Sequence, residues 1–248
     1  MAKTAEPAPV AAPRDVPGRG GALIWKHFKP WIGPILLFVV LRGFVLGAFH
    51  IWPTGSMAPT LLIDDYLFVN QLLYGAKVPF TAWHLPAFRA PRRDEIVIFD
   101  SPETPGLTVV KRIIGEPGDT LAMRLGSIIR NGAPLDEPYT QHTRPLGWNP
   151  SEPGLQMRLW QRPYLVADTG DYRPDLENWG PIVVPPDSFF VMGDNRDESY
   201  DSRFWGFLGR NRIEGRPFLI YFSFDRLGAL PLPALTGIRF GRMLRVPG

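Results

Sequence analysis

The nineteen residues from Trp31 to Phe49 are almost wholly apolar, and this run constrains the chain more than any other feature. At a helical rise of about 1.5 Å per residue, such a run nearly crosses a hydrocarbon core about 30 Å thick. Arg42 opposes insertion by roughly 2.5 to 3.5 kcal/mol, but it lies past the midpoint and its long side chain can reach the far interface. The run therefore predicts one transmembrane helix.

Two other interpretations fit the apolar run less well. A cleavable signal peptide has a shorter apolar core and ends in a small-x-small site, whereas this run continues into His50-Ile51-Trp52. A helix buried in a protein core does not explain why Lys26 and Lys29 lie at one end of the run. Basic residues on the N-terminal side predict a cytoplasmic N-terminus.

We therefore expect three parts in the chain. Residues 1–22 are rich in Ala, Pro and Gly, and are predicted to form a disordered cytoplasmic tail. Residues 23–52 are expected to be the membrane anchor, and residues 53–248 a folded domain outside the cytoplasm. The prediction is a single-pass protein of the inner (plasma) membrane, in contact with membrane lipid.

Composition narrows the chemistry of the folded part. The absence of cysteine excludes disulfides, a thiol nucleophile and a thiolate metal site. The 27 Lys and Arg residues are nearly balanced by 24 Asp and Glu, and no dense basic stripe with interleaved aromatics occurs, so we expect no nucleic-acid partner. A hydrophobic content of 45% is ample for a buried core.

Short runs of β-branched and aromatic residues indicate that the folded part is mainly β. Strands are predicted after a turn at Asp64-Asp65, over Arg93–Phe99, over Leu107–Gly115 and within residues 183–192. Residues 75–92 are expected to form an irregular apolar loop that packs over the core or rests on the membrane surface. Residues from about 120 to 185 are weakly periodic and predict a smaller inserted β/loop subdomain.

Ser56 stands in a Gly- and Pro-rich loop shortly after the apolar run, and it is a candidate nucleophile. A serine in such a loop is often only a turn residue. An ordinary hydroxyl is a poor nucleophile at neutral pH and needs a neighbouring base. The functional interpretation of Ser56 therefore depends on finding that base.

Strand alternation places Lys111 on the same face as Val109 and Ile113, which is an unusual position for an ammonium group. If this face is buried, desolvation lowers the pKa of the lysine and leaves an amine that can accept a proton. The alternative is a lysine on an edge strand that faces solvent. His84 and His142 are the other possible bases, but both stand in loops without a motif.

The stretch from Gly193 to Gly206 places many charged and hydroxyl residues directly after an apolar strand, which indicates a hydrogen-bonded loop at a site. A calcium loop beginning at Asp197 lacks the Gly and Glu required at its sixth and twelfth positions, so we expect no metal. Asp201 and Arg203 can form an ion pair that fixes the loop. The Ser199 hydroxyl is then left to orient the lysine amine.

Four motifs follow the apolar run in order. They are Pro-Thr-Gly-Ser-Met-x-Pro-Thr-Leu (53–61), Asp-x-Leu-x-Val-Asn-x-x-x-Tyr-Gly (65–75), Val-Lys-Arg-Ile-Ile-Gly-x-Pro-Gly-Asp (110–119) and Gly-Asp-Asn-Arg-Asp-x-Ser-x-Asp-Ser-Arg-x-Trp-Gly (193–206). Together they closely resemble the motifs of bacterial type I signal peptidases, which are serine proteases. The resemblance covers the helix and residues 53 to about 222, without the insertion. It implies a largely antiparallel β domain with a smaller β extension, tethered by one or more membrane helices.

The resemblance also implies roles for individual residues. Ser56 becomes the nucleophile and Lys111 the general base. The Ser56 N–H and the Thr54 hydroxyl become the oxyanion hole, although the family commonly has Ser where this chain has Thr54. The further implied roles are catalytic support by Ser199, Asp201 and Arg203, and substrate binding by Pro53, Met57, Leu61, Val109 and Val110.

The function implied by the resemblance is removal of N-terminal signal peptides from secretory preproteins, without a cofactor. Three alternatives remain. A specialised peptidase of one secretion or conjugation system shares all four motifs. A self-cleaving repressor also uses Ser and Lys, but it is soluble and carries a helix-turn-helix. A noncatalytic envelope protein on the same scaffold is disfavoured by the intact Ser56 and Lys111.

Overall fold

The computed structural model describes residues 19–40, 46–51, 54–76, 81, 83, 85–143, 153–167, 170–226 and 233–248. The chain divides into two compact units, residues 1–40 and residues 41–248. The described part of the first unit is one helix, α1 (Arg19–Val40), which contains Pro30 and Pro34. Within the ranges given above, no helix is both long and apolar enough to span a membrane.

The apolar run does not form one helix as far as Phe49. Helix α1 ends at Val40, and β1 (Leu46–His50) is a strand that pairs antiparallel with β2 (Asp65–Asn70). Apolar content alone does not separate a helix from a strand, and here the sheet ladder satisfies the β1 backbone. The predicted helix is therefore wrong over Leu46–Phe49. The predicted tail is also too long, because α1 begins at Arg19; residues 1–18 and 41–45 lie outside the described residues.

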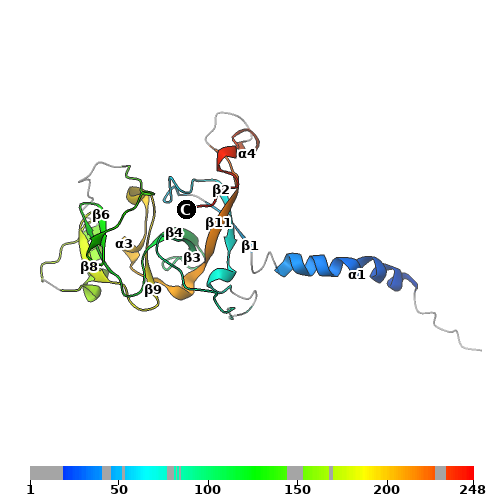
Figure 1. Cartoon of the computed structure of the whole chain (residues 1–248), viewed down its shortest axis with the longest axis horizontal. Helices are drawn as coiled ribbons and strands as arrows, with labels where there is room; N and C mark the ends of the chain where they lie inside the picture. The colour runs from blue at the N-terminus through cyan, green and yellow to red at the C-terminus, as the bar shows by residue number, and fades with distance from the viewer. Residues whose placement is uncertain are drawn as a thin grey trace, which may run out of the picture. The chain divides into compact units, whose positions relative to one another are not determined.

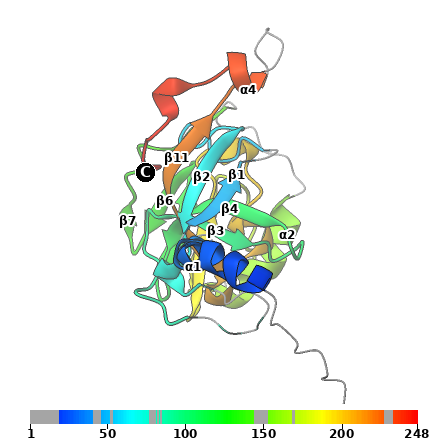
Figure 2. The same ribbon diagram turned by 90° about the vertical axis from the view of Figure 1, so that its right-hand side faces the viewer.

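The second unit is built on a seven-stranded antiparallel sheet with the order β1-β2-β11-β3-β4-β9-β10, and most of its strands are labelled in Figure 1. The remaining strands are β3 (Ile96–Asp100), β4 (Thr108–Gly115), β9 (Ser188–Met192), β10 (Leu208–Gly209) and β11 (Ile213–Ser223). The long strand β11 pairs with β2 and with β3 and has register shifts in both ladders. It therefore joins the two halves of the sheet, and Figure 2 shows β1, β2 and β11 side by side.

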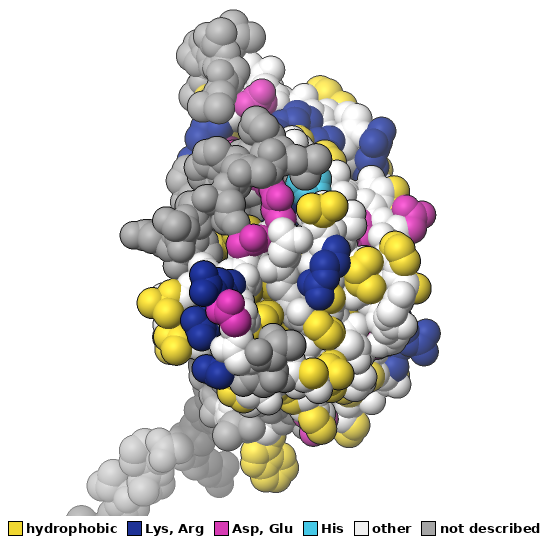
Figure 3. Space-filling view, turned by 90° about the vertical axis from the view of Figure 1, so that its left-hand side faces the viewer, with side chains coloured by type: hydrophobic (Ala, Val, Ile, Leu, Met, Phe, Trp, Pro, Cys, Tyr) yellow, Lys and Arg dark blue, Asp and Glu magenta, His cyan; other side chains and the backbone are white. Residues whose placement is uncertain are grey.

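A second, four-stranded sheet has the order β7-β6-β5-β8. Its strands are β5 (Thr120–Arg124), β6 (Ser127–Arg130), β7 (Ala133–Pro134) and β8 (Trp179–Val183). It occupies the region for which we expected an inserted β/loop subdomain, and it belongs to the same compact unit as the larger sheet. On the face that includes this sheet, acidic, basic and apolar side chains are interspersed (Figure 3).

The described short helices of the second unit lie between its strands or after the last strand, β11. They are α2 (Pro153–Gln161), α3 (Ser202–Trp205), α4 (Pro233–Thr236) and the single-turn 3-10 segments Leu72–Tyr74, Arg162–Tyr164, Arg196–Glu198, Arg210–Arg212 and Phe240–Arg242. Within the predicted loop 75–92, Trp83 and Phe88 are largely exposed. These two rings therefore do not pack over the core.

Three clusters of buried apolar residues form the core. The first joins the smaller sheet and α2 to the ends of β4 and β9, with Trp179 and Phe190 as its largest members. The second lies beneath the Ser56 loop and includes Met57, Leu61 and Val110. The third contains Val97, Phe99, Ile113 and Val191, and has Val109 packed against it. Strand β4 contributes to all three clusters, so its side chains are held rigidly on both faces.

Candidate active site

The loop that carries Ser56 is held by backbone hydrogen bonds and by two side chains buried in the core. Its turn is closed by backbone hydrogen bonds from Ala58 N to Gly55 O and from Leu61 N to Met57 O, each 2.9 Å long. Met57 and Leu61 are buried in the second core cluster and do not line the cavity beside Ser56. They support the loop instead, because their burial fixes the backbone next to Ser56. Pro53 lies outside the described residues.

Lys111 reaches Ser56 from strand β4. Its side chain is 3% exposed, and its Nζ lies 2.6 Å from Ser56 Oγ. Burial lowers the pKa of Lys111 to about 8, and the nearby charge of Arg203 acts in the same direction. The alternative of a solvent-facing edge lysine is thus excluded. His142 is removed from this contact, with its Nδ1 3.8 Å from Asp197 Oδ1, while His84 lies outside the described residues.

At Gly193 the loop after β9 packs closely against the loop that carries Ser56. A Cβ at Gly193 would lie 2.4 Å from both Ser199 Oγ and Ser56 O, so only glycine fits there. The Gly193 amide lies 3.1 Å from Ser199 Oγ and 3.1 Å from Asp201 Oδ2. The next residues add a direct link, because Asn195 N donates to Ser56 O at 3.0 Å. The loop after β9 is therefore fixed against the Ser56 loop.

Asp201 and Arg203 pair as the sequence suggested. Arg203 donates from Nε to Asp201 Oδ1 and from Nη2 to Asp201 Oδ2, both at 2.9 Å. Burial alone would raise the pKa of Asp201, but the charge and hydrogen bonds of Arg203, with the Ser199 hydroxyl, hold it below its usual value. The contacts described for the Ser199 hydroxyl are those with Gly193 and Asp201, and its orientation of Lys111 stays a prediction.

Thr54 lies on the open side of Ser56. Its Oγ1 is 3.5 Å from Ser56 Oγ, at the limit of a hydrogen bond, and the residue is exposed. The hydroxyl is therefore free to turn toward a group bound above Ser56.

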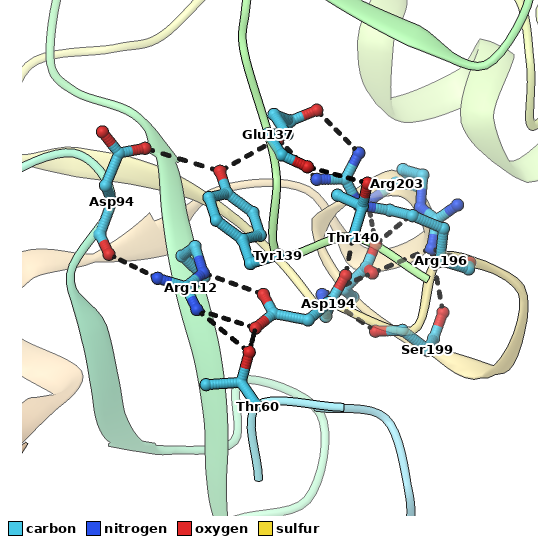
Figure 4. Close-up of polar contacts among 12 residues, drawn as sticks. Thr60, Asp94, Arg112, Glu137, Tyr139, Thr140, Asp194, Arg196, Ser199 and Arg203 are labelled. Carbon is cyan, nitrogen blue, oxygen red and sulfur yellow. Dashed lines mark hydrogen bonds and ion pairs between the residues drawn. The ribbon is translucent and has the colours of Figure 1, made fainter. Parts of the chain in front are cut away.

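The opposite face of β4 carries an ion pair that the sequence did not indicate (Figure 4). Arg112 donates from Nε to Asp194 Oδ1 at 2.8 Å and from Nη2 to Asp194 Oδ2 at 2.7 Å, and both side chains are buried. Thr60 Oγ1 donates to the same carboxylate at 2.5 Å. Both charged residues lie in the motifs quoted above, but no spacing rule shows that they pair.

A cavity of about 260 Å³ opens beside Ser56 and Lys111. Val109 and Val110 line it, as expected, together with Thr54. Sequence reasoning missed several further lining residues: Phe49, Ile51, Phe99, Leu107 and Trp205 on its apolar walls, and Glu103, Glu198 and Tyr200 among its polar groups. Most are scattered apolar strand or loop residues, and only folding brings them together.

One edge of β4 near the cavity is not covered by its neighbour β9. Strand β3 pairs with β4 from Thr108 to Arg112, whereas β9 pairs with it at Arg112, Ile113 and Gly115. The ladder on the β9 side thus begins only after Lys111. A buried hydroxyl in contact with a buried amine, beside this strand edge and a cavity, is the arrangement that nucleophilic catalysis by serine requires.

Comparisons with known proteins agree with that class. The family described as "Signal peptidase, peptidase S26" matches residues 24–222. Signal peptidase I of Leptolyngbya laminosa is 35% identical over 206 residues, which cover 80% of each chain. Signal peptidase I of Pseudomonas aeruginosa is 30% identical over 238 residues, covering 87% of this chain and 79% of its own. The chain therefore belongs to the signal peptidase family S26 and is a serine endopeptidase.

A solved signal peptidase I from Enterococcus faecalis V583 also matches, at 29% identity. The match covers 52% of this chain and 98% of that one, with a TM-score of 0.35. Among the described residues, no group of three or more His, Cys, Asp or Glu side chains is placed to hold a metal ion.

Proposed function

We propose that this enzyme removes N-terminal signal peptides from secretory preproteins, with Ser56 as the nucleophile and Lys111 as the general base. The observation that carries the proposal is the 2.6 Å distance between Ser56 Oγ and Lys111 Nζ, both buried. The lowered pKa of Lys111, about 8, gives a useful fraction of neutral amine near neutral pH. Membership of the signal peptidase family supplies the substrate class.

Acylation follows from this geometry. Ser56 Oγ attacks the scissile carbonyl carbon while its proton passes to Lys111 Nζ. The Ser56 N–H and the Thr54 hydroxyl stabilise the negative oxygen of the tetrahedral intermediate. When the C–N bond breaks, the protonated Lys111 gives its proton to the leaving amine. The mature protein departs, and the signal peptide remains bound to Ser56 as an ester.

Deacylation uses the same groups. Lys111, again neutral, takes a proton from a water molecule as the water oxygen attacks the ester carbonyl. The second tetrahedral intermediate collapses and returns the proton to Ser56 Oγ. The signal peptide then leaves with a new C-terminal carboxylate. Ser199, Asp201 and Arg203 support this cycle by holding Gly193 and the loop that contacts Ser56.

The substrate segment is proposed to bind as an extended strand along the β4 edge at residues 108–111. Main-chain hydrogen bonds at such an edge give affinity, and pockets for alternate side chains give specificity. The cavity of about 260 Å³, lined by Val109 and Val110, suits small side chains near the scissile bond. This agrees with the small-x-small segment that precedes a signal-peptide cleavage site.

The N-terminal segment is proposed to anchor the enzyme in the inner membrane, with one pass and a cytoplasmic N-terminus. Lys26 and Lys29 give the orientation. Because β1 begins at Leu46, the embedded segment ends before that residue. Protease added outside spheroplasts should digest residues 53–248 and spare the tail. Protection of residues 53–248 would reverse the orientation.

The direct test of the activity is cleavage of a precursor by the purified full-length chain in detergent. A secretory precursor should be cut once, and the new N-terminus should follow its small-x-small segment. The matched substrate control carries large side chains at the two small positions and should remain intact. Cleavage of both substrates at equal rates, or of neither, would contradict the proposed function. Testing several unrelated precursors distinguishes a general enzyme from one devoted to a single secretion system.

A further inference from the structure

A short segment after strand β7 contacts the loop that follows β9. Residues 137–141 come after β7, and Gln141 meets the loop through the backbone. Gln141 N donates to Asp194 O at 2.8 Å, and Arg196 N donates to Gln141 O at 3.0 Å. The loop that contacts Ser56 is therefore bonded on its other side to the inserted region.

Glu137 makes the strongest contact of this segment. It receives Arg196 Nη1 on Oε2 at 3.0 Å and Arg196 Nη2 on Oε1 at 2.5 Å, with side-chain exposures of 7% and 3%. Arg196 in turn donates from Nε to Gly193 O at 3.2 Å, and its own carbonyl accepts from Arg203. Glu137 thus fixes the residue that holds the Gly193 carbonyl.

Tyr139 connects the same segment to strand β4. The Arg112 guanidinium lies 3.9 Å above the centre of the Tyr139 ring, and the Tyr139 hydroxyl lies 3.1 Å from Glu137 Oε1 (Figure 4). Arg112 is the residue next to Lys111 and holds Asp194, which is next to Gly193. Residues 137–141 therefore contact both chain segments that carry the site, one through Arg112 and the other through Arg196.

We propose that Glu137 and Tyr139 are positioning residues, which hold Lys111 and Gly193 in register with Ser56. The proposal rests on the proposed use of Lys111 as the base. Small movements at Gly193 matter because there is almost no free space around it. A Cβ at this position would already collide with its neighbours. A shift of Gly193 is passed to Ser56, because Asn195 N is bonded to Ser56 O. The inserted region thereby acquires a role in catalysis without touching the substrate.

The test compares full-length variants in detergent, after the wild type has been shown to cleave a precursor. Glu137→Gln removes the charge that holds Arg196 while keeping the shape of the side chain. We expect kcat to fall about tenfold or more, because misplacement of reacting groups by about 1 Å can cost about 100-fold in rate, while KM changes less than about threefold. Loosening the site admits water to Lys111, so the Lys111 amine should titrate at higher pH. This titration can be followed by nitrogen NMR without any cleavage assay, because the chain has only five lysines.

Two further variants separate positioning from stability. The double variant E137Q/R196Q restores the balance of buried charge but loses the bond from Arg196 to Gly193, so Tm should recover while kcat stays low.

The control variant is Arg130→Gln. It breaks the ion pair between Arg130 and Asp119, which is 2.6 Å long, and should lower Tm without moving the Lys111 titration. Recovery of kcat together with Tm in the double variant, or an unchanged Lys111 titration in E137Q, would overturn the proposal. If E137Q does not fold, the comparison of Tyr139→Leu with Tyr139→Phe tests the proposal instead. Only Tyr139→Leu removes the ring beneath Arg112, so only Tyr139→Leu should lower kcat and move the Lys111 titration.

Discussion

The two faces of strand β4 carry neighbouring cations with different surroundings. Lys111 and Arg112 are adjacent, and each is almost fully buried. Arg112 is bound in a fork by Asp194, receives the Tyr139 ring on one side and also donates to the Asp94 carbonyl. Lys111 has a serine hydroxyl as its hydrogen-bond partner, and Asp201 and Asp194 influence it only through space.

This difference shows how one strand can hold a structural cation and a reactive one. A paired, hydrogen-bonded guanidinium tolerates burial because its charge is compensated. A buried ammonium without a carboxylate in contact loses hydration, and its pKa falls, here to about 8. Lys111 and Arg112 are adjacent and both basic, but they are therefore not equivalent. Each position has a separate task, and the two tasks can be tested separately.

The largest effects on activity should come from Ser56→Ala and from Lys111→Met, which keeps most of the length of the side chain and removes the amine. We expect kcat/KM to fall by about a thousandfold or more, since a general base typically contributes 10²–10⁴-fold. Ser56→Ala should abolish cleavage altogether. Both variants should keep the fold, because neither group neutralises a buried charge. Precursor cleavage and thermal unfolding measure the two properties, and a Lys111→Met enzyme with near wild-type rate would remove the basis of the comparison.

The opposite face of β4 should respond to Asp194→Asn through stability. Removing one partner of a buried ion pair leaves Arg112 uncompensated, which typically costs about 3–5 kcal/mol of unfolding free energy. The matched control is Asp171→Asn, because its pair with Arg173 is 2.8 Å long but both side chains are about three-quarters exposed. That control should change stability by less than about 1 kcal/mol. Equal losses measured by chemical denaturation would contradict the contrast between the two faces.

Lys111 should also make both activity and stability depend on pH. The pKa of Lys111 is about 8 in the folded chain against an ordinary value of 10.5. kcat/KM should therefore rise with an apparent pKa near 8. Between pH 8 and 10.5 the unfolded chain binds more protons at this site, so the folded state gains stability as the pH rises. Relative to Lys111→Met, the gain should total roughly 3 kcal/mol, and it should be absent below pH 8.

Much of the site could be predicted from the sequence, because its main signals are local. Strand alternation identified Lys111 as a lysine on an apolar face, and the motif around Ser56 lay in a turn. The dense polar stretch after β9 correctly indicated that Asp201 and Arg203 pair. The predominance of β structure also followed from short apolar runs separated by turn residues.

The remaining features depend on contacts between distant residues. Leu46–Phe49 are as apolar as a helix that crosses a membrane, and only the pairing of β1 with β2 makes them a strand. The collision that excludes a Cβ at Gly193 involves Ser56, far away in the sequence. Ser199 was expected to contact Lys111, whereas the contacts described for its hydroxyl are with Gly193 and Asp201. Hydrogen-bond partners of this kind cannot be read from residue types alone.

The smallest expected effect concerns Thr54, which contacts Ser56, the hydrogen-bond partner of Lys111. If its hydroxyl stabilises the developing oxyanion, Thr54→Val should lower kcat by about 10- to 100-fold, at or below the range for removing one oxyanion donor, because the side chain is exposed. Thr54→Ser keeps the hydroxyl and should retain most of the activity. KM and Tm should hardly change in either variant, since Thr54 Oγ1 makes only a 3.5 Å contact with Ser56 Oγ. Equal rates for the Val and Ser variants would mean that the Thr54 hydroxyl does not contribute to the reaction at Ser56.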